Sequence, residues 1–278
     1  MELNKIHRKQ VAYFYVVCFL ISYAWLFFNS LLLHQLKPVL FINRLDISLN
    51  ILFLTGIQKA VIQNNFLQLL LDILYLFFPF TLLLTVNSKK QIYAAIGNSV
   101  FNFIYALLLS SFSTLSIEGF VSWILLPLLF LFNSEKGFYY VLHSMRYVFL
   151  MIFFSTGLWK LRAGGIFNID EMSGILLKQH AAYISQQSND WFSSVIHYLV
   201  VHYKFSYTFY LATTLLELTF VVGLFTRKFD KLLIVLFILF VCFDFVLMRI
   251  NYFSWVAFLG CLWYAKYDEA GKDKPLVR

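Results

Sequence analysis

The chain has 278 residues, of which 61% are hydrophobic and only 13% are charged, and its formal net charge is +8. A soluble chain of this length could not bury so much apolar surface, because a small folded domain leaves a large part of its surface in water. We therefore expect the lipid bilayer to be part of the solvent, with the basic residues in loops against anionic lipid. No basic stretch outside the apolar segments is interleaved with aromatic residues, so we expect no nucleic-acid partner.

Eight apolar segments in chain order predict membrane-spanning helices, each of which needs ~20 apolar residues. They are residues 11–33, 66–86, 91–111, 117–133, 139–161, 206–226, 231–249 and 251–266. The first has no cleavage site for a signal peptidase, so we interpret it as a retained helix. The fourth is short and contains Pro127, which predicts a broken or tilted helix.

The charges of the loops predict the orientation of these helices. Lys and Arg gather before the first segment and after the second, fourth, sixth and eighth, as Lys5, Arg8, Lys9, Lys89, Lys90, Lys136, Arg227, Lys228, Lys231, Lys266, Lys272, Lys274 and Arg278. This alternation is the positive-inside pattern. We expect an all-α, polytopic membrane helical bundle that forms one domain over residues 1–278. Both termini and the tail 267–278 are expected on the cytoplasmic side, in the inner (cytoplasmic) membrane of a bacterium.

Two long connections, residues 34–65 and 162–205, fall on the extracytoplasmic side of this topology. Within the second, residues 171–184 and 190–203 are amphipathic, which predicts helices that lie in the membrane interface. The predicted apolar faces are Met172, Ile175, Leu176 and Ile184 in one helix and Trp191, Val195, Leu199 and Val200 in the other. Gly164 and Gly165 mark the end of the fifth span.

Charged residues within the spans are few and costly to insert, so they are the candidates for structural or functional roles. Arg146 and Glu217 lie at similar depths on consecutive long segments, and we predict that they form a buried ion pair, either structural or engaged with a ligand or proton. Four more charges lie toward the outer side: Lys160, Asp72, Asp244 and Arg249. We predict either that they converge on one outward-facing cavity or that they snorkel and pair separately. The six His residues show no i, i+4 spacing, so we expect no metal centre.

Several features occur in an order that resembles a known family. The segment SMRYVFLMIFFSTGLWKLRAGGIFN (144–168) has an Arg, an apolar run and a Lys-Leu pair where the chain leaves the membrane. An interfacial stretch follows, then LLELTFVVGLFTRKFDK (215–231) with Glu217, and FVCFDFVLMRINYFSWVAFLG (240–260) with its Phe-Ser pair. This order resembles the vitamin K-dependent gamma-carboxylase-like family, also called the horizontally transferred transmembrane domain (HTTM) family. The resemblance covers residues 66–266 and is best over 140–266; DoxX-like membrane proteins share part of this architecture.

In the carboxylases, the Lys of the Lys-Leu element is the proposed base that deprotonates vitamin K hydroquinone, and Lys160 occupies the matching position. The resemblance therefore implies an outward-facing site with Lys160 as a base. Other parts of the family pattern are missing: Val241 or a neighbour replaces the catalytic His, residues 114–133 lack the His-bearing motif, and no segment matches the large lumenal domain. Glutamate carboxylation is not implied.

Two functions follow from these observations. The first is a membrane subunit that associates with or matures a membrane or secreted partner protein or peptide at the extracytoplasmic face, with the buried charges as structural pairs. The second is a quinone- or lipid-binding membrane enzyme in which Lys160 is the base and Asp244 or Asp72 tunes it. The missing His favours the first and the retained Lys160 favours the second, so the sequence leaves open whether the chain is an enzyme. A quinone is the one cofactor that the resemblance suggests.

Overall fold

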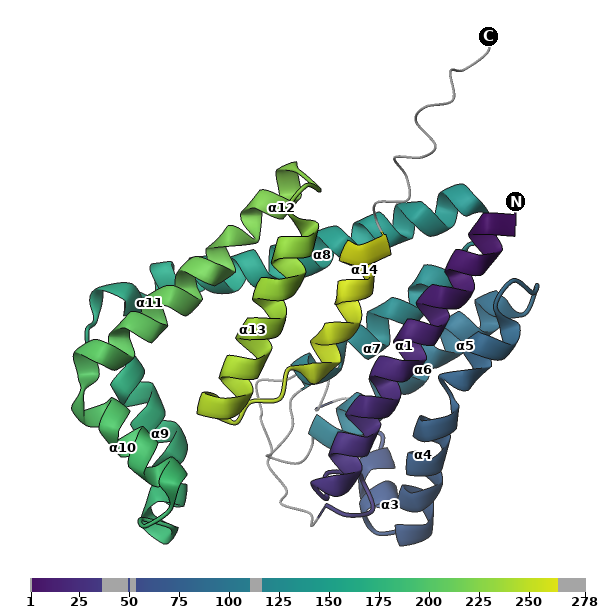
Figure 1. Cartoon of the computed structure of the whole chain (residues 1–278). Coiled ribbons are helices and arrows are strands. Elements are labelled where there is room, and N and C mark those ends of the chain that lie inside the picture. The colour runs from purple at the N-terminus through teal and green to yellow at the C-terminus, as the bar shows by residue number, and fades with distance from the viewer. Residues whose placement is uncertain (1, 37–49, 51–53, 111–116, 265–278) are drawn as a thin grey trace. The chain divides into compact units, whose positions relative to one another are not determined.

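The computed structural model of the chain describes residues 2–36, 50, 54–110 and 117–264. Within these ranges every regular element is an α-helix or a short 3₁₀ helix, and none is a strand (Figure 1). The all-helical prediction is therefore confirmed for this part of the chain. The tail 267–278 and the predicted loop around residues 113–116 lie outside the described residues.

Five helical stretches are long and apolar enough to cross a membrane. They are α1 (Glu2–Phe28), α6 (Gln91–Ser110), α8 (Glu135–Arg162), the consecutive α11 (Tyr203–Thr219) and α12 (Val221–Phe225), and α13 (Asp230–Met248). Each coincides with one of the eight predicted spans. The chain thus has the helices of an integral membrane protein.

The other three predicted spans consist of shorter helical segments. α4 (Asn65–Phe77) stops just before Pro79, and α5 (Phe80–Thr85) begins directly after it. Proline has no N–H to donate and its ring crowds the preceding turn, so the helix is interrupted there. A short helix, α3 (Ile57–Ile62), precedes this pair.

The segment with Pro127 is broken, as predicted. It consists of the 3₁₀ helix η1 (Ile117–Phe120), the short α7 (Val121–Leu125) and the 3₁₀ helix η2 (Leu126–Leu131), which contains the proline near its start. The last predicted span likewise begins as a 3₁₀ helix, η4 (Phe253–Phe258), and continues as α14 (Leu259–Tyr264). The existence of helical structure at all eight places agrees with the prediction, whereas eight complete crossings stay a prediction.

The chain divides into two compact units, which we call unit 1 (residues 1–145 and 253–278) and unit 2 (residues 146–252). In unit 1, α6 packs against η2, α7 and α5, and α1 packs against η4. Aromatic rings fill its interior: Tyr75 stacks on Tyr105 with ring centroids 3.7 Å apart, and Phe19 meets Tyr75 and Trp123 edge-on at 4.8 and 5.3 Å. Such offset and edge-to-face pairs add to the stabilisation that burial provides.

Unit 2 has two clusters of buried side chains. Phe149 and Phe153 of α8 pack against Phe220 and against Phe237 of α13, with ring centroids between 4.7 and 5.9 Å apart. The second cluster belongs to η3 (Gly165–Phe167), α9 (Glu171–Gln186) and α10 (Trp191–Val201), which lead into α11. Its buried residues are Met172, Leu176, Phe192, Ile196, Leu199, Tyr210 and Met248.

The two amphipathic helices predicted in this region are therefore confirmed as α9 and α10. The predicted apolar face of α9 is the packed one, since Met172 and Leu176 are buried and Ile175 and Ile184 pack against them. The face predicted for α10 is wrong in part: Trp191 is 64% exposed, and the chain instead buries Phe192. α10 is apolar around most of its circumference, so periodicity alone could not select its packed face.

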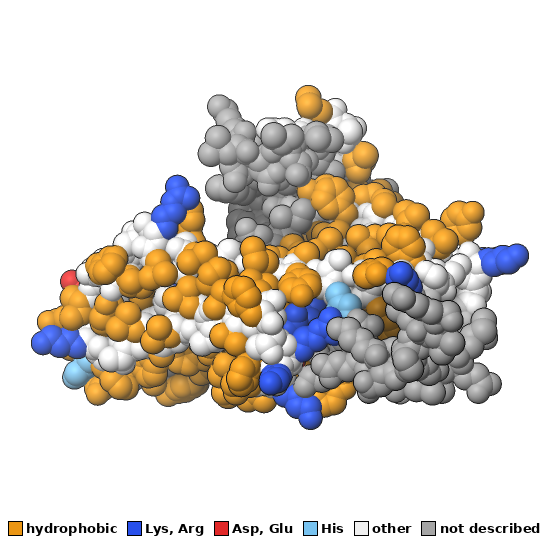
Figure 2. All heavy atoms as spheres, turned by 90° about the horizontal axis from the view of Figure 1, so that it is seen from above, with side chains coloured by type: hydrophobic (Ala, Val, Ile, Leu, Met, Phe, Trp, Pro, Cys, Tyr) orange, Lys and Arg blue, Asp and Glu red, His pale blue; other side chains and the backbone are white. Residues whose placement is uncertain are grey.

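Large apolar side chains remain exposed along the long helices. Figure 2 shows hydrophobic side chains over much of the coloured surface. On α13, for example, Val235 and Leu239 are 52% and 57% exposed. Apolar surface this extensive would aggregate in water but suits contact with lipid tails.

Candidate functional site

Arg146 forms a closed ion pair within unit 2. Its guanidinium donates to both carboxylate oxygens of Asp230, from Nη2 to Oδ1 at 2.6 Å and from Nε to Oδ2 at 3.1 Å. Nη2 also donates to the Gly223 carbonyl at 2.7 Å, and both side chains are only 1% exposed. A bidentate pair with a further carbonyl acceptor satisfies these charges away from water, so this contact locks α8 to the turn between α12 and α13.

The predicted Arg146–Glu217 pair is therefore wrong, because Glu217 pairs with Lys160 instead. The prediction compared depths along the helix axes and ignored where the side chains lean. Helical side chains point back toward the N-terminus of their own helix. Arg146 accordingly leans toward the turn that carries Asp230, whereas Lys160 leans inward and meets Glu217 of α11.

Lys160 is directed into unit 2. Its ammonium lies 2.8 Å from Glu217 Oε1, and the side chains are 27% and 4% exposed respectively. The same ammonium lies 5.6 Å from the centre of the Tyr210 ring, a cation–π distance. Gly157, one turn before Lys160, permits this approach: a Cβ there would lie 3.0 Å from Leu218 and 3.2 Å from Glu217 Cβ. Of the two roles predicted for Lys160, a snorkelling anchor and an inward amine, the geometry favours the second.

The other oxygen of Glu217 has no partner among the described residues. Oε2 is buried and accepts no hydrogen bond there. Thr156 is nearby, but its hydroxyl donates to the Phe153 carbonyl at 2.6 Å. A buried acceptor left unpaired costs about 1–3 kcal/mol, so a group that donates to Oε2 would stabilise the site.

Asp244 of α13 is the third charged member of this site. It is half-buried, and its charge interacts with those of Lys160 and Glu217. We call Lys160, Glu217 and Asp244 the lysine cluster. With all three ionised the cluster holds two negative charges and one positive charge, and a ligand that donates a hydrogen bond or brings a proton would offset the excess. Asp244 is thus within electrostatic range of Lys160, whereas the ion pair of Lys160 is made with Glu217.

Asp72, the other predicted tuning carboxylate, lies in unit 1, where its side chain is hydrogen-bonded to other residues. Tyr105 donates to Oδ1 at 2.6 Å, the Leu33 N–H donates to the same oxygen at 3.2 Å, and His34 contacts Oδ2 at 2.5 Å. Both oxygens are therefore engaged by groups of unit 1. The prediction that Asp72 shares a site with Lys160 gains no support from these contacts.

Arg249 is likewise separate from the lysine cluster. It ends α13 in the left-handed conformation (φ 54°), and its guanidinium lies 4.3 Å from the centre of the Phe192 ring of α10. Its charge interacts with Asp190, which caps the start of α10. Arg249 thus holds the end of α13 to the α9–α10 hairpin.

Comparison with known protein families, with curated proteins and with solved structures finds no match for this chain. The resemblance to the carboxylase-like family therefore stays a prediction.

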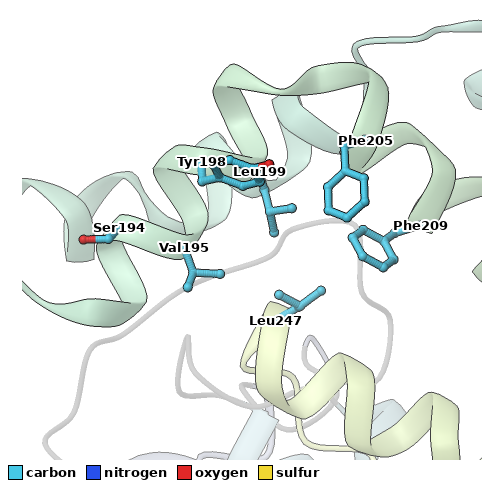
Figure 3. A pocket seen from close by; sticks show the side chains of 7 residues that line it. All are labelled: Ser194, Val195, Tyr198, Leu199, Phe205, Phe209 and Leu247. Carbon is cyan, nitrogen blue, oxygen red and sulfur yellow. The ribbon is translucent and has the colours of Figure 1, made fainter.

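An apolar pocket of about 410 Å³ lies elsewhere in unit 2 (Figure 3). It is lined by Ser194, Val195, Tyr198 and Leu199 of α10, Phe205 and Phe209 of α11, and Leu247 of α13. In Figure 3 the rings of Phe205 and Phe209 and the side chain of Leu247 face the same space. The volume falls in the usual range for small-molecule sites, and the wall suits a hydrocarbon chain.

Sequence reasoning missed three polar partners that the structure brings into play: Asp230, His34 and Tyr105. Asp230 lies just outside the predicted span 231–249, although an acidic residue in the first turn of a helix is a recognisable signal. His34 lies just past the first span, and Tyr105 looks like any aromatic residue in a membrane helix. Only the tertiary fold brings the last two together at Asp72.

Proposed function

We propose that this chain binds a membrane-soluble amphiphile, a quinone or a lipid, at the lysine cluster, with Lys160 as the candidate base. The observation that carries the proposal is the buried, unpartnered oxygen of Glu217 beside the Lys160 ammonium. A ligand hydroxyl can donate to that oxygen, and the Lys160 ammonium can donate to a ligand oxygen. Purely structural ion pairs have both partners satisfied, as Arg146 and Asp230 do.

The apolar pocket supports an amphiphile over a small polar ligand. Asp244 of the lysine cluster and Leu247 of the pocket are three residues apart on α13, about one helical turn. Phe209 of the pocket directly precedes Tyr210, whose ring faces the Lys160 ammonium. A ligand with a polar head and a hydrocarbon tail would match this succession of polar and apolar groups.

The chemistry of such a site follows from the ion pair. While Glu217 holds the ammonium, Lys160 has no lone pair with which to take a proton. In a site from which a ligand excludes water, the Lys160 ammonium can pass one proton to the Glu217 carboxylate, so that a neutral amine and a neutral acid replace the ion pair. Lys160 then acts as a base toward an acidic hydroxyl of the ligand.

The test is to identify what the protein carries. We would purify the full chain in lipid nanodiscs, extract it, and quantify quinones and lipids by mass spectrometry against empty nanodiscs. The proposal predicts one amphiphile enriched to roughly one molecule per chain, as expected for a single site. An extract with the same composition as the empty nanodiscs would contradict it.

A second candidate function is a membrane subunit that associates with or matures a partner protein or peptide at the extracytoplasmic face. The α9–α10 hairpin favours it, because one side of the hairpin is packed in a hydrophobic core while Trp191, Tyr198 and Val201 are 64, 53 and 56% exposed. Aromatic side chains on a rigid element are typical anchors of protein interfaces. A photo-crosslinking amino acid at Tyr198 would yield one discrete protein adduct under this hypothesis, and only lipid adducts under the first.

The wider architecture is part of the proposal. Eight spans with both termini in the cytoplasm, in a bacterial inner membrane, are supported by the alternating basic loops and by helical structure at each predicted place. Membership of the carboxylase-like family is supported by the order of Arg146, Lys160 and Glu217 along the sequence.

A further inference from the structure

Asp72 in unit 1 is the centre of a second polar cluster, remote in sequence from the lysine cluster. Its side chain is 1% exposed and accepts four contacts. Oδ1 accepts from the Tyr105 hydroxyl at 2.6 Å and from the Leu33 N–H at 3.2 Å, while Oδ2 accepts from the His34 N–H at 3.0 Å and lies 2.5 Å from His34 Nδ1. A buried carboxylate with so many donors is held in one orientation.

The sequence builds this cluster from three helices. α1 ends at Phe28, and the turn that follows aims the backbone N–H groups of Leu33 and His34 at α4, which carries Asp72. Tyr23 of α1 donates to the Asp72 carbonyl at 3.4 Å, and Tyr105 reaches in from α6. The stacked rings of Tyr75 and Tyr105 lie beside the carboxylate and keep it away from water.

The contact to Asp72 fixes the tautomer of His34. A carboxylate can only accept, so Nδ1 must carry the proton that is shared with Asp72. In the neutral ring Nε2 then holds the lone pair. The His34 side chain is 31% exposed, and Nε2 has no hydrogen-bond partner among the described residues.

We propose that Asp72 and His34 form an oriented proton-transfer site in unit 1, in which His34 Nε2 takes a proton from a hydroxyl or thiol group of a bound molecule. The proton passes from the ligand O–H or S–H to Nε2, the ring becomes an imidazolium, and the Asp72 carboxylate beside Nδ1 stabilises that cation until the proton leaves to water. Asp72 is a positioning residue here, since it acts through the imidazole and touches no ligand. Tyr105 holds the second carboxylate oxygen and so fixes the direction of the first.

A purely structural reading makes a different prediction. If the cluster served only to cap the turn after α1, the imidazole would be one donor among four, and its basicity would be irrelevant. The proposal requires that Nε2 be an unusually reactive base for its exposure. The reaction rate of His34 Nε2 therefore distinguishes a proton-transfer site from a structural cap.

The chain contains a matched control for this comparison. His202 is exposed, and its Nδ1 lies 2.9 Å from the Tyr198 carbonyl, so its ring is also bonded at Nδ1. The partner there is a neutral carbonyl oxygen, whereas His34 has a carboxylate. Exposure alone predicts that His202 reacts at least as fast as His34, and the proposal predicts the reverse order.

The experiment uses diethyl pyrocarbonate as the probe on the full chain in lipid nanodiscs, at a pH well above the ordinary imidazole pKa of about 6.5. The unprotonated ring nitrogen attacks a carbonyl carbon of the probe and becomes carbethoxylated, and the leaving group departs as ethanol and carbon dioxide. Peptide mass spectrometry gives the rate at each histidine. We expect His34 to react several-fold faster than His202, and Asp72→Asn to slow His34 by about tenfold while His202 is unchanged.

A second variant keeps the outcome interpretable. Tyr105→Phe retains the bond between Asp72 and His34, so His34 should react within about twofold of its rate in the unaltered chain. If Asp72→Asn unfolds the turn instead, His34 becomes more accessible and its rate rises, which contradicts the proposal. A His34 that reacts no faster than His202 in the unaltered chain would overturn the proposal, as would a His34 rate that Asp72→Asn leaves unaltered.

Discussion

Asp230 supplies the charge that allows Arg146 to lie buried in unit 2. Asp230→Ala removes both carboxylate contacts and leaves the guanidinium without a counter-charge, which costs about 3–5 kcal/mol of folding free energy. The variant should accumulate poorly and unfold at a lower temperature. The double variant Arg146→Met with Asp230→Leu removes both charges and should recover most of the loss.

Glu217 provides the control for this pair. Arg146→Met combined with Glu217→Leu leaves Asp230 and Lys160 each without its partner, so it should be less stable than Arg146→Met with Asp230→Leu. Equal stability of the two double variants, measured by thermal unfolding in nanodiscs, would contradict the observed pairing.

For Arg146 and Lys160, the sequence predicts that the residues matter but not which residues they pair with. The cost of a charge in the membrane identified both residues, and Glu217 and Asp244, as important without any structure. The pairing could not be predicted, because depth along a helix says nothing about rotation around it or about the lean of a long side chain. His34 and Tyr105 gave no signal of their own, since their role depends on Asp72 in another helix.

Gly223 of α12 is a point of close approach between helices. A Cβ there would lie 2.7 Å from Leu150 of α8 and 2.8 Å from Leu233 of α13, and the Gly223 carbonyl accepts from Arg146. Gly223→Ala should therefore destabilise unit 2 by about 1–3 kcal/mol through overpacking.

Gly174 of α9 is the matched control, because it is also helical and a Cβ there would have no atom within 4 Å. Gly174→Ala should be neutral or stabilising by up to about 1 kcal/mol, since alanine has the higher helix propensity. If the two alanine variants unfold at the same temperature, the packing described around Gly223 is wrong.

The α9–α10 hairpin should lose stability in mild acid. Burial is the largest effect on His180 and lowers its pKa; the hydrogen bond to the Leu247 carbonyl opposes this more weakly, and the Arg249 charge adds a still smaller lowering. The unfolded hairpin therefore binds more protons than the folded one, and stability falls as the pH drops below about 6.5. Hydrogen exchange of α9 amides, corrected for intrinsic rates, should show this loss, and His180→Gln should abolish it.

The elements that could be predicted are those with a clear hydrophobic period, a long apolar run or a proline. The long apolar helices, the break at Pro127 and the existence of α9 and α10 all follow from the sequence. The packed face of α10 did not follow, because its apolar residues surround the helix and only contact with the neighbouring helices selects Phe192 and Ile196.

At the scale of the whole molecule, the orientation in the membrane is the open prediction. With the native cysteines replaced, a cysteine at Ser185 should react with an impermeant maleimide added to intact cells, and one at Ser88 should react only after permeabilisation. Ser185 is exposed on α9, and Ser88 precedes the basic pair Lys89–Lys90. Labelling of Ser88 in intact cells would reverse the topology.

Ligand retention in matched variants tests the proposed function most directly. Lys160→Met removes the ammonium of the lysine cluster, whereas Arg162→Met removes a cation on the same helix that stacks on Trp159 outside the cluster. The two proteins would be purified in identical nanodiscs, and the bound amphiphile would be quantified per chain by mass spectrometry. We expect Lys160→Met to lose at least about tenfold of the bound ligand, equivalent to ~1.4 kcal/mol of binding free energy, and Arg162→Met to lose none. A Lys160→Met protein that keeps the same ligand at the same stoichiometry would contradict it.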